Sequence, residues 1–293
     1  MTSGLSEFVL LRQRRMRFRI WGDATAPRLF LLHGWGDVAA SFQFVVDALR
    51  RDWRVIAPDW RGFGESQWNG GAYWFPDYIA DLDALLEHYS PDEPARLVGH
   101  SMGGNVATLY AGIRPGRVAG IVNLEGFGLQ PTDPADAPDR YGRWLDQLRA
   151  EAGFRTYPDH AAFAARLRHD NPRLTQDRAA FLAEHLAETT AGGVRLAADP
   201  CHRWVNPILY RIEEAKACWR RVTAPVLWVR GADSGFLREY IPAADDYRER
   251  LACLADARDV LLAECGHNIH HDRPEDVARL IEEFFPYDAD QHA

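Results

Sequence analysis

A glycine-flanked serine motif constrains this chain more than any other feature. Residues 99–103 read G-H-S-M-G, between the apolar pair Leu97 and Val98 and a helical pattern over residues 105–111. A serine placed between a strand and a helix lies on a sharp, strained turn that exposes its hydroxyl, and the flanking glycines let strand and helix approach closely. The following helix directs its positive end at the same point. The motif therefore predicts that Ser101 is a nucleophile presented at the end of a strand.

Short apolar runs alternate with helical patterns around this motif. The alternation predicts a parallel sheet wrapped by helices, which an antiparallel pair of strands opens and an amphipathic helix from Pro274 closes. The strand expectations are residues 8–11, 16–21, 28–32, 54–57, 97–98, 120–124, 225–229 and 260–262, with helices over 41–49 and 76–89.

The pattern changes in the middle of the chain. Between about residues 128 and 221 no buried strand run occurs, and prolines separate short helical segments. One segment has apolar residues at i, i+3, i+4 and i+7, typical of a one-sided helix, namely Tyr141, Trp144, Leu145 and Leu148. We therefore predict a core domain formed by residues 1–127 and 222–293, interrupted by a helical cap over residues 128–221.

Composition narrows the possible partners. The chain is 47% hydrophobic and 26% charged, with a net charge of −8, which argues against nucleic acid or an anionic membrane as a partner. Four cysteines without C-x-x-C spacing predict free thiols in a reducing compartment and neither a zinc site nor a disulfide framework. The first eight residues are too polar for a signal peptide, and no apolar run reaches the ~20 residues of a membrane span. We expect a cytoplasmic protein with a small-molecule substrate and no cofactor or metal; no sequence feature specifies an oligomeric state.

The candidate catalytic residues all follow predicted strands, where open α/β sheets build their sites. His267, in a G-H-N stretch after the last strand, suits a general base because imidazole titrates near neutrality. His270 and His271 are alternatives to it. A G-W-G stretch after His33 can aim the Trp35 backbone N–H at Ser101, and the Met102 N–H comes from the helix start, so that two donors would hold an oxyanion. The alternative for this stretch is a tight turn without a catalytic role.

Four motifs together resemble those of the α/β-hydrolase superfamily. They are H-G-W at 33–35, D-W-R-G-F-G-E-S at 59–66, G-H-S-M-G-G at 99–104 and G-H at 266–267, in that family's order. The resemblance implies the α/β-hydrolase fold, a mostly parallel twisted sheet flanked by helices, with an inserted cap and a serine hydrolase mechanism. It also implies that Asp59 and Arg61 belong to a structural turn.

The acid that orients His267 is where the sequence departs from the usual pattern of this family. Members commonly place an aspartate three or four residues after the glycine ending the strand that starts at Val226; here Ser234 and Gly235 stand there, and Asp233 is the nearest carboxylate. Haloalkane dehalogenases of the same superfamily place a glutamate after the strand that follows the nucleophile, and Glu125 is similar in position. A carboxylate ending an apolar strand needs a partner, because burying it unpaired costs several kcal/mol. Glu125 is the preferred acid and Asp233 the alternative.

The serine limits the chemistry. Dehalogenases and epoxide hydrolases of this superfamily use an aspartate nucleophile, which Ser101 cannot replace. We predict a carboxylic ester hydrolase acting through an acyl-enzyme on a small to medium apolar substrate. Thioester, lactone and carbon–carbon bond hydrolysis and perhydrolysis would use the same residues, and a non-enzymatic ligand-binding receptor of the same fold is a further alternative. The predicted pocket residues are Gly34, His100, Phe127, Trp144 and Trp204.

Overall fold

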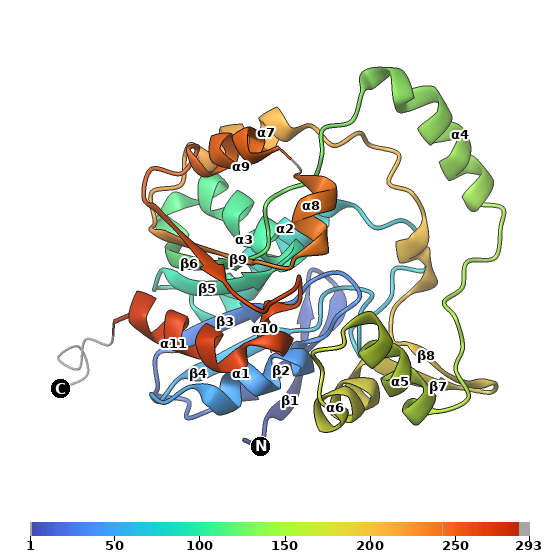
Figure 1. The fold of residues 1–293 in the computed structure, drawn as a ribbon, viewed down its shortest axis with the longest axis horizontal. Coiled ribbons are helices and arrows are strands. Elements are labelled where there is room, and N and C mark those ends of the chain that lie inside the picture. Colours follow the sequence, from blue (N-terminus) through green and yellow to red (C-terminus); the bar gives the residue numbers. More distant parts are fainter. Residues whose placement is uncertain (1, 242, 287–293) are drawn as a thin grey trace.

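The computed structural model describes residues 2–241 and 243–286, and its centre is an eight-stranded sheet (Figure 1). The strand order is β1-β2-β4-β3-β5-β6-β9-β10, and every neighbouring pair is parallel except β1 with β2 and β2 with β4. In chain order the strands are β1 (Leu5–Leu11), β2 (Arg14–Trp21), β3 (Arg28–Leu32), β4 (Arg54–Pro58), β5 (Ala95–His100), β6 (Val118–Leu124), β9 (Val226–Gly231) and β10 (Ala257–Leu262).

Helices cover both faces of the sheet (Figure 1). Consecutive residues of β5 point to opposite sides: Leu97 belongs to one buried apolar cluster and Val98 to another. The continuous apolar runs in the sequence are thus explained by burial on both faces. The first cluster includes residues of α2 (Phe75–Tyr89), α3 (Met102–Ile113) and α7 (Ile212–Trp219), and the second includes residues of α1 (Gln43–Ala48), α10 (Ile269–Asp272) and α11 (Pro274–Phe284).

The predicted fold class is confirmed, and each predicted strand overlaps an observed one. The segment 128–221 is not purely helical, however. Besides α4 (Ala137–Gln147), α5 (His160–Asp170) and α6 (Gln176–Leu186) it contains an antiparallel hairpin of β7 (Ala187–Thr190) and β8 (Gly193–Leu196). The hairpin lacks the apolar run of a buried strand, because Val194 is its one fully buried residue. Helix α7, at the end of the segment, packs on α3 of the core.

The inserted segment attaches to the core unevenly. Helices α5 and α6 form a third apolar cluster with Val38 and Phe44 of the core. Helix α4 has no buried residue and arches away from the sheet (Figure 1). Its predicted helical span is confirmed, but the apolar stripe does not pack, since Tyr141 and Leu145 are 46% and 47% exposed.

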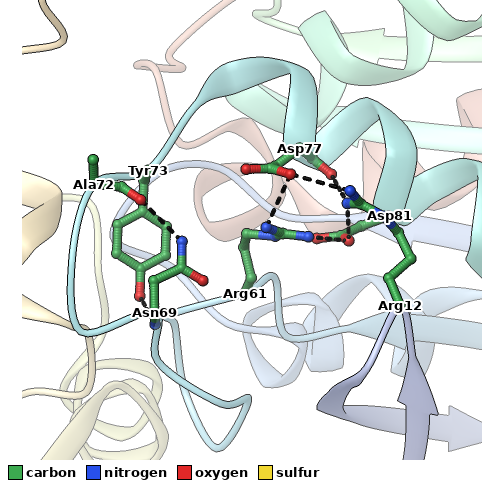
Figure 2. A network of polar contacts seen from close by, with 7 residues as sticks. All are labelled: Arg12, Arg61, Asn69, Ala72, Tyr73, Asp77 and Asp81. Atoms are coloured by element: carbon green, nitrogen blue, oxygen red, sulfur yellow. Dashed lines mark hydrogen bonds and ion pairs between the residues drawn. The ribbon is translucent and has the colours of Figure 1, made fainter.

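The turn over residues 59–66 is held by ion pairs (Figure 2). Buried Arg61 contacts both carboxylate oxygens of Asp81 at 2.5 Å and also pairs with Asp77, and Arg12 contacts the same two carboxylates. Asp59 is fully buried and accepts the Ala39 N–H at 2.8 Å. A cavity of about 390 Å³ beside Arg61 is lined by none of Ser101, His267 and Glu125. Asp59 and Arg61 thus bind other parts of the core.

Two short helices follow β9: α8 (Gly235–Tyr240) and α9 (Ala244–Leu251). Among the described residues, no helix combines the length and apolar character needed to cross a membrane.

Candidate active site

Ser101 lies on the turn between β5 and α3 in a backbone conformation that L-residues rarely adopt. Its φ is 50° and its ψ is −112°, and its N–H donates to the Leu124 carbonyl of the neighbouring strand at 2.8 Å. Such strain persists only where the surrounding structure imposes it, and it is concentrated at functional sites. Helix α3 can lie this close to β3 because residue 103 is glycine: a Cβ there would lie 2.1 Å from the Leu32 carbonyl oxygen.

A linear chain of contacts joins Ser101 to a histidine and a carboxylate. His267 Nε2 lies 3.1 Å from Ser101 Oγ, and His267 Nδ1 lies 3.0 Å from Glu125 Oε2. His267 comes from the loop between β10 and α10, and its side chain is 27% exposed. The two ring nitrogens therefore face two different partners, the arrangement that lets an imidazole accept a proton on one side while its other N–H is held in place.

Glu125 is buried completely and its carboxylate is fully engaged. It follows β6 in a left-handed conformation, with φ of 61°. Its Oε1 accepts the Gly231 N–H at 2.7 Å, and its Oε2 accepts the Ser234 hydroxyl at 2.5 Å besides facing His267. A buried carboxylate with several donors avoids the cost of an unpaired charge. Sequence reasoning noticed Ser234 only as the residue where an aspartate is usual; its contact with Glu125 was not foreseen.

Asp233, the alternative acid, is not in this chain of contacts. Its carboxylate is 49% exposed and forms an ion pair with Arg173 of the inserted segment at 2.5 Å. The helix cap beside it is Ser234, whose Oγ accepts the Leu237 N–H. Asp233 stands one residue before Ser234, and its side chain faces the insertion; this corrects the alternative assignment.

The alternative bases, His270 and His271, do not contact Ser101. His270 and His271 are buried on α10, and His270 Nε2 contacts Asp37 Oδ2 at 3.1 Å instead of Ser101. Burial lowers the pKa of His271 to about 3, so this imidazole is neutral at pH 7. Burial favours the neutral acid for Asp37, but the hydrogen bond from His270 and the nearby imidazoles outweigh it and lower the pKa of this carboxyl.

Two further side chains hold the His267 loop. The Phe236 ring stacks on the imidazole of His267, with centroids 4.5 Å apart and planes 19° from parallel. His100 is the second, and its Nε2 contacts the His267 carbonyl at 2.9 Å. His100 is only 3% exposed, so it supports the loop and does not line an open pocket, which corrects its predicted role. Phe236 carries no sequence signal, because its contact depends on where α8 packs.

The loop over residues 33–36 lies against the nucleophile. A Cβ on Gly34 would be 3.2 Å from Ser101 Cβ and 2.8 Å from His100 Nδ1, so the loop can approach this closely only with glycine. Met102 is the first residue of α3, where backbone N–H groups have no acceptor within the helix. Both expected oxyanion donors, Trp35 and Met102, therefore belong to segments that adjoin Ser101.

The aromatic pocket residues are dispersed. Phe127 is fully buried and stacks on Trp228, with centroids 5.2 Å apart, so it is a core residue; this corrects its assignment. Trp144 lies on the outlying helix α4, and Trp204 lines a cavity of about 270 Å³ within the insertion that none of Ser101, His267 and Glu125 lines. Trp35 instead belongs to the loop that adjoins Ser101, and it is 52% exposed with its ring centroid 6.3 Å from that of Phe154.

The sheet, the strained serine turn and the two contacts that join Ser101, His267 and Glu125 together define the α/β-hydrolase class. A family model described as alpha/beta hydrolase fold matches residues 27–274, and the chain belongs to this family.

Known proteins similar to this chain include several hydrolases. A serine hydrolase-like protein of Danio rerio is 29% identical over 287 residues, which cover 94% of this chain and 87% of the relative. A 3-hydroxybutyrate-oligomer hydrolase of Cupriavidus necator is 29% identical over 76% of this chain and 78% of the relative. Among solved structures, a thioesterase domain from the curacin biosynthetic pathway superimposes with a TM-score of 0.84 at 25% identity, covering 95% of this chain and 99% of that one.

Proposed function

We propose that this protein is a serine hydrolase that cleaves carboxylic esters of small to medium, largely apolar substrates. The observation that carries the proposal is the contact of Ser101 Oγ with His267 Nε2 at 3.1 Å while Glu125 faces the opposite ring nitrogen at 3.0 Å. A hydroxyl becomes a competent nucleophile when an adjacent base removes its proton, and a third group keeps that base in the required tautomer.

The proposed reaction has two halves. His267 takes the Ser101 proton as the oxygen attacks the ester carbonyl, and the N–H groups of Trp35 and Met102 stabilise the resulting oxyanion. His267 then protonates the leaving alcohol, which leaves an acyl-Ser101. Water, deprotonated by His267, attacks this acyl group and releases the acid and the free serine. Glu125 stabilises the imidazolium that forms in each half.

Apolar substrate preference is supported by aromatic side chains from the loop that adjoins Ser101 and from the helix that packs on His267. Trp35 belongs to the loop that adjoins Ser101, Phe154 lies near its ring, and partly exposed Phe236 stacks on His267. Ester-like bonds are also consistent with the names of two relatives, one a thioesterase domain and one an oligomer hydrolase. Thioesters, lactones, carbon–carbon bonds and perhydrolysis require the same residues and are the alternative reactions.

A panel of p-nitrophenyl esters with increasing acyl length tests the proposal. We expect turnover that rises from acetyl to medium acyl chains and falls by roughly 10⁴- to 10⁶-fold in Ser101→Ala. A parallel series of acyl thioesters and lactones ranks the alternative bonds by kcat/KM. Absence of turnover on every substrate, together with tight binding of an apolar ligand, would favour the receptor alternative.

A further inference from the structure

A second cluster of polar side chains is buried beneath the loop that carries His267. Asp37 comes from the loop after β3, and His270 and His271 come from α10. They are 7%, 0% and 6% exposed. One donor atom of each residue lies within 4.8 Å of the donor atoms of the other two. The hydroxyl of buried Ser41 adds an oxygen, 2.8 Å from Asp37 Oδ2 and 3.3 Å from His270 Nε2.

Two ring nitrogens of this cluster have no hydrogen-bond partner among the described residues. Within the described residues, Asp37 has no lysine or arginine partner, and its one ion pair is with His270. Asp37 Oδ1 accepts the Val38 N–H at 2.9 Å, and His270 Nδ1 has no hydrogen-bond partner among the described residues. His271 Nε2 also lacks a partner there. Buried groups in this condition call for a further ligand.

We propose that Asp37, His270 and His271 bind one transition-metal ion of the Zn²⁺ class, with Ser41 as the adjoining oxygen. Two imidazoles and a carboxylate are ligands that Zn²⁺ takes in proteins. Metal–ligand bonds of about 2.0–2.2 Å place neighbouring tetrahedral ligands about 3.3 Å apart, close to the 3.1 Å between Asp37 Oδ2 and His270 Nε2. The donor atoms lie within 4.8 Å of one another, so a contraction of up to about 1.5 Å brings the remaining donor to this spacing. No local pattern indicates this site, because Asp37 and His270 are 233 residues apart in the chain.

The position of the site gives the ion a structural role. Asp37 follows the loop whose Gly34 adjoins Ser101, and α10 begins two residues after His267. The His270 ring is 4.4 Å from that of His100, which in turn supports the His267 loop. The ion would therefore join the loop after β3 to α10 and stabilise both, while the contacts of Ser101, His267 and Glu125 do not include its ligands.

Metal titration of the full chain tests the site without any measurement of activity. Protein stripped with a chelator is titrated with Zn²⁺ and with Co²⁺ alone, and we expect one equivalent bound, visible absorption typical of four-coordinate Co²⁺, and a thermal midpoint about 5 °C higher at 100 times the Kd. His271→Gln and Asp37→Asn should weaken binding at least about 100-fold. His88→Gln, at an exposed position on α2, is the matched control and should leave binding unchanged.

X-ray absorption of the Zn²⁺-loaded wild type serves as a readout that needs no folded variant. Two imidazole ligands with oxygen would support the site, whereas sulfur ligation would overturn it. Binding that His271→Gln and Asp37→Asn leave intact, or no binding to the stripped wild type, would also overturn it.

Discussion

Two groups of a serine, a histidine and a carboxylate each place their histidine ring beside that of His100, and they differ in how the three side chains connect. In one group, Ser101 and Glu125 contact opposite nitrogens of His267. In the other, Ser41 and Asp37 both contact Nε2 of His270. The Ser41 hydroxyl also donates directly to Asp37, which closes a triangle.

The difference shows that residue types alone do not define a catalytic site. Activation of a serine nucleophile needs a base whose lone pair faces the hydroxyl while its opposite N–H faces the acid. His267 can meet this requirement, whereas the Nε2 of His270 is shared between a hydroxyl and a carboxylate. Exposure separates the groups as well, since Ser41 is fully buried and Ser101 is partly exposed. The first arrangement suits proton transfer, and the second suits structural binding.

The largest expected contrast lies between the two histidines. His267→Gln should lower kcat on a p-nitrophenyl ester by roughly 10⁴- to 10⁶-fold, because the base is removed. His270→Gln should leave kcat per folded molecule within about tenfold of wild type and should instead lower stability, since it removes the ion-pair partner of the buried Asp37 carboxylate. Initial rates, corrected for folded fraction by circular dichroism, measure both effects. Equal losses of kcat in the two variants would contradict the comparison.

The next largest difference in kcat is expected between variants of Glu125 and Asp233, the two candidate acids. Glu125→Gln should lower kcat by about 10⁴-fold, since the amide no longer holds the His267 tautomer. Asp233→Asn should change kcat by less than about threefold, because an exposed ion pair with Arg173 contributes only about 0–1 kcal/mol. The control is the thermal midpoint of each variant. A sharp loss in Asp233→Asn with full activity in Glu125→Gln would reverse the assignment.

Substitution of Ser234 should lower kcat by a smaller factor, because this residue acts by holding Glu125. Ser234→Ala removes one charge-assisted hydrogen bond, worth about 1.5–3 kcal/mol, and we expect kcat to fall about 10- to 100-fold. Ser234→Thr retains the hydroxyl and should restore most of the activity. The pH dependence of kcat distinguishes positioning from a folding defect: its acidic limb should move in Ser234→Ala and stay in place in Ser234→Thr. Identical pH profiles in all three proteins would argue against the contact.

His202 is a partly buried histidine that is held by aromatic stacking. Its ring stacks on Phe63 and Tyr73 with centroids 3.9 Å and 3.6 Å away, and burial lowers its pKa from 6.5 to about 4. Because the folded state holds the neutral ring, this contribution to stability is complete above pH 6.5 and is lost as pH falls toward 4. Urea unfolding at pH 7 and pH 5 should show a loss about 2 kcal/mol smaller in His202→Phe than in wild type. The same loss in both proteins would contradict the assignment.

Much of the sheet could be predicted from the sequence because its strands are buried on both faces and read as apolar runs. The turn at Ser101 was predictable because its glycines are required by close backbone contacts that leave a sequence signature. The hairpin β7–β8 was missed, since partly exposed strands with Glu188 and Arg195 show no such run.

Fewer residues of the site than of the sheet could be predicted from the sequence, for a different reason. Glu125 could be predicted as the acid because it ends an apolar strand, whereas the ion pair that holds Asp233 away from His267 is a tertiary contact with Arg173 that no local pattern indicates. Phe127 looked like a pocket residue and is a core residue, because sequence does not reveal which way an aromatic ring points. Ser234 and Phe236 depend on how α8 packs beside the His267 loop, a tertiary contact without a local pattern.

Reaction with a fluorophosphonate probe, followed by peptide mass spectrometry, tests the contrast between the two serines most directly. We expect one probe adduct per chain, located on Ser101 and lost in His267→Gln, with Ser41 unmodified. An adduct on Ser41, or an unreactive Ser101 in folded protein, would contradict it.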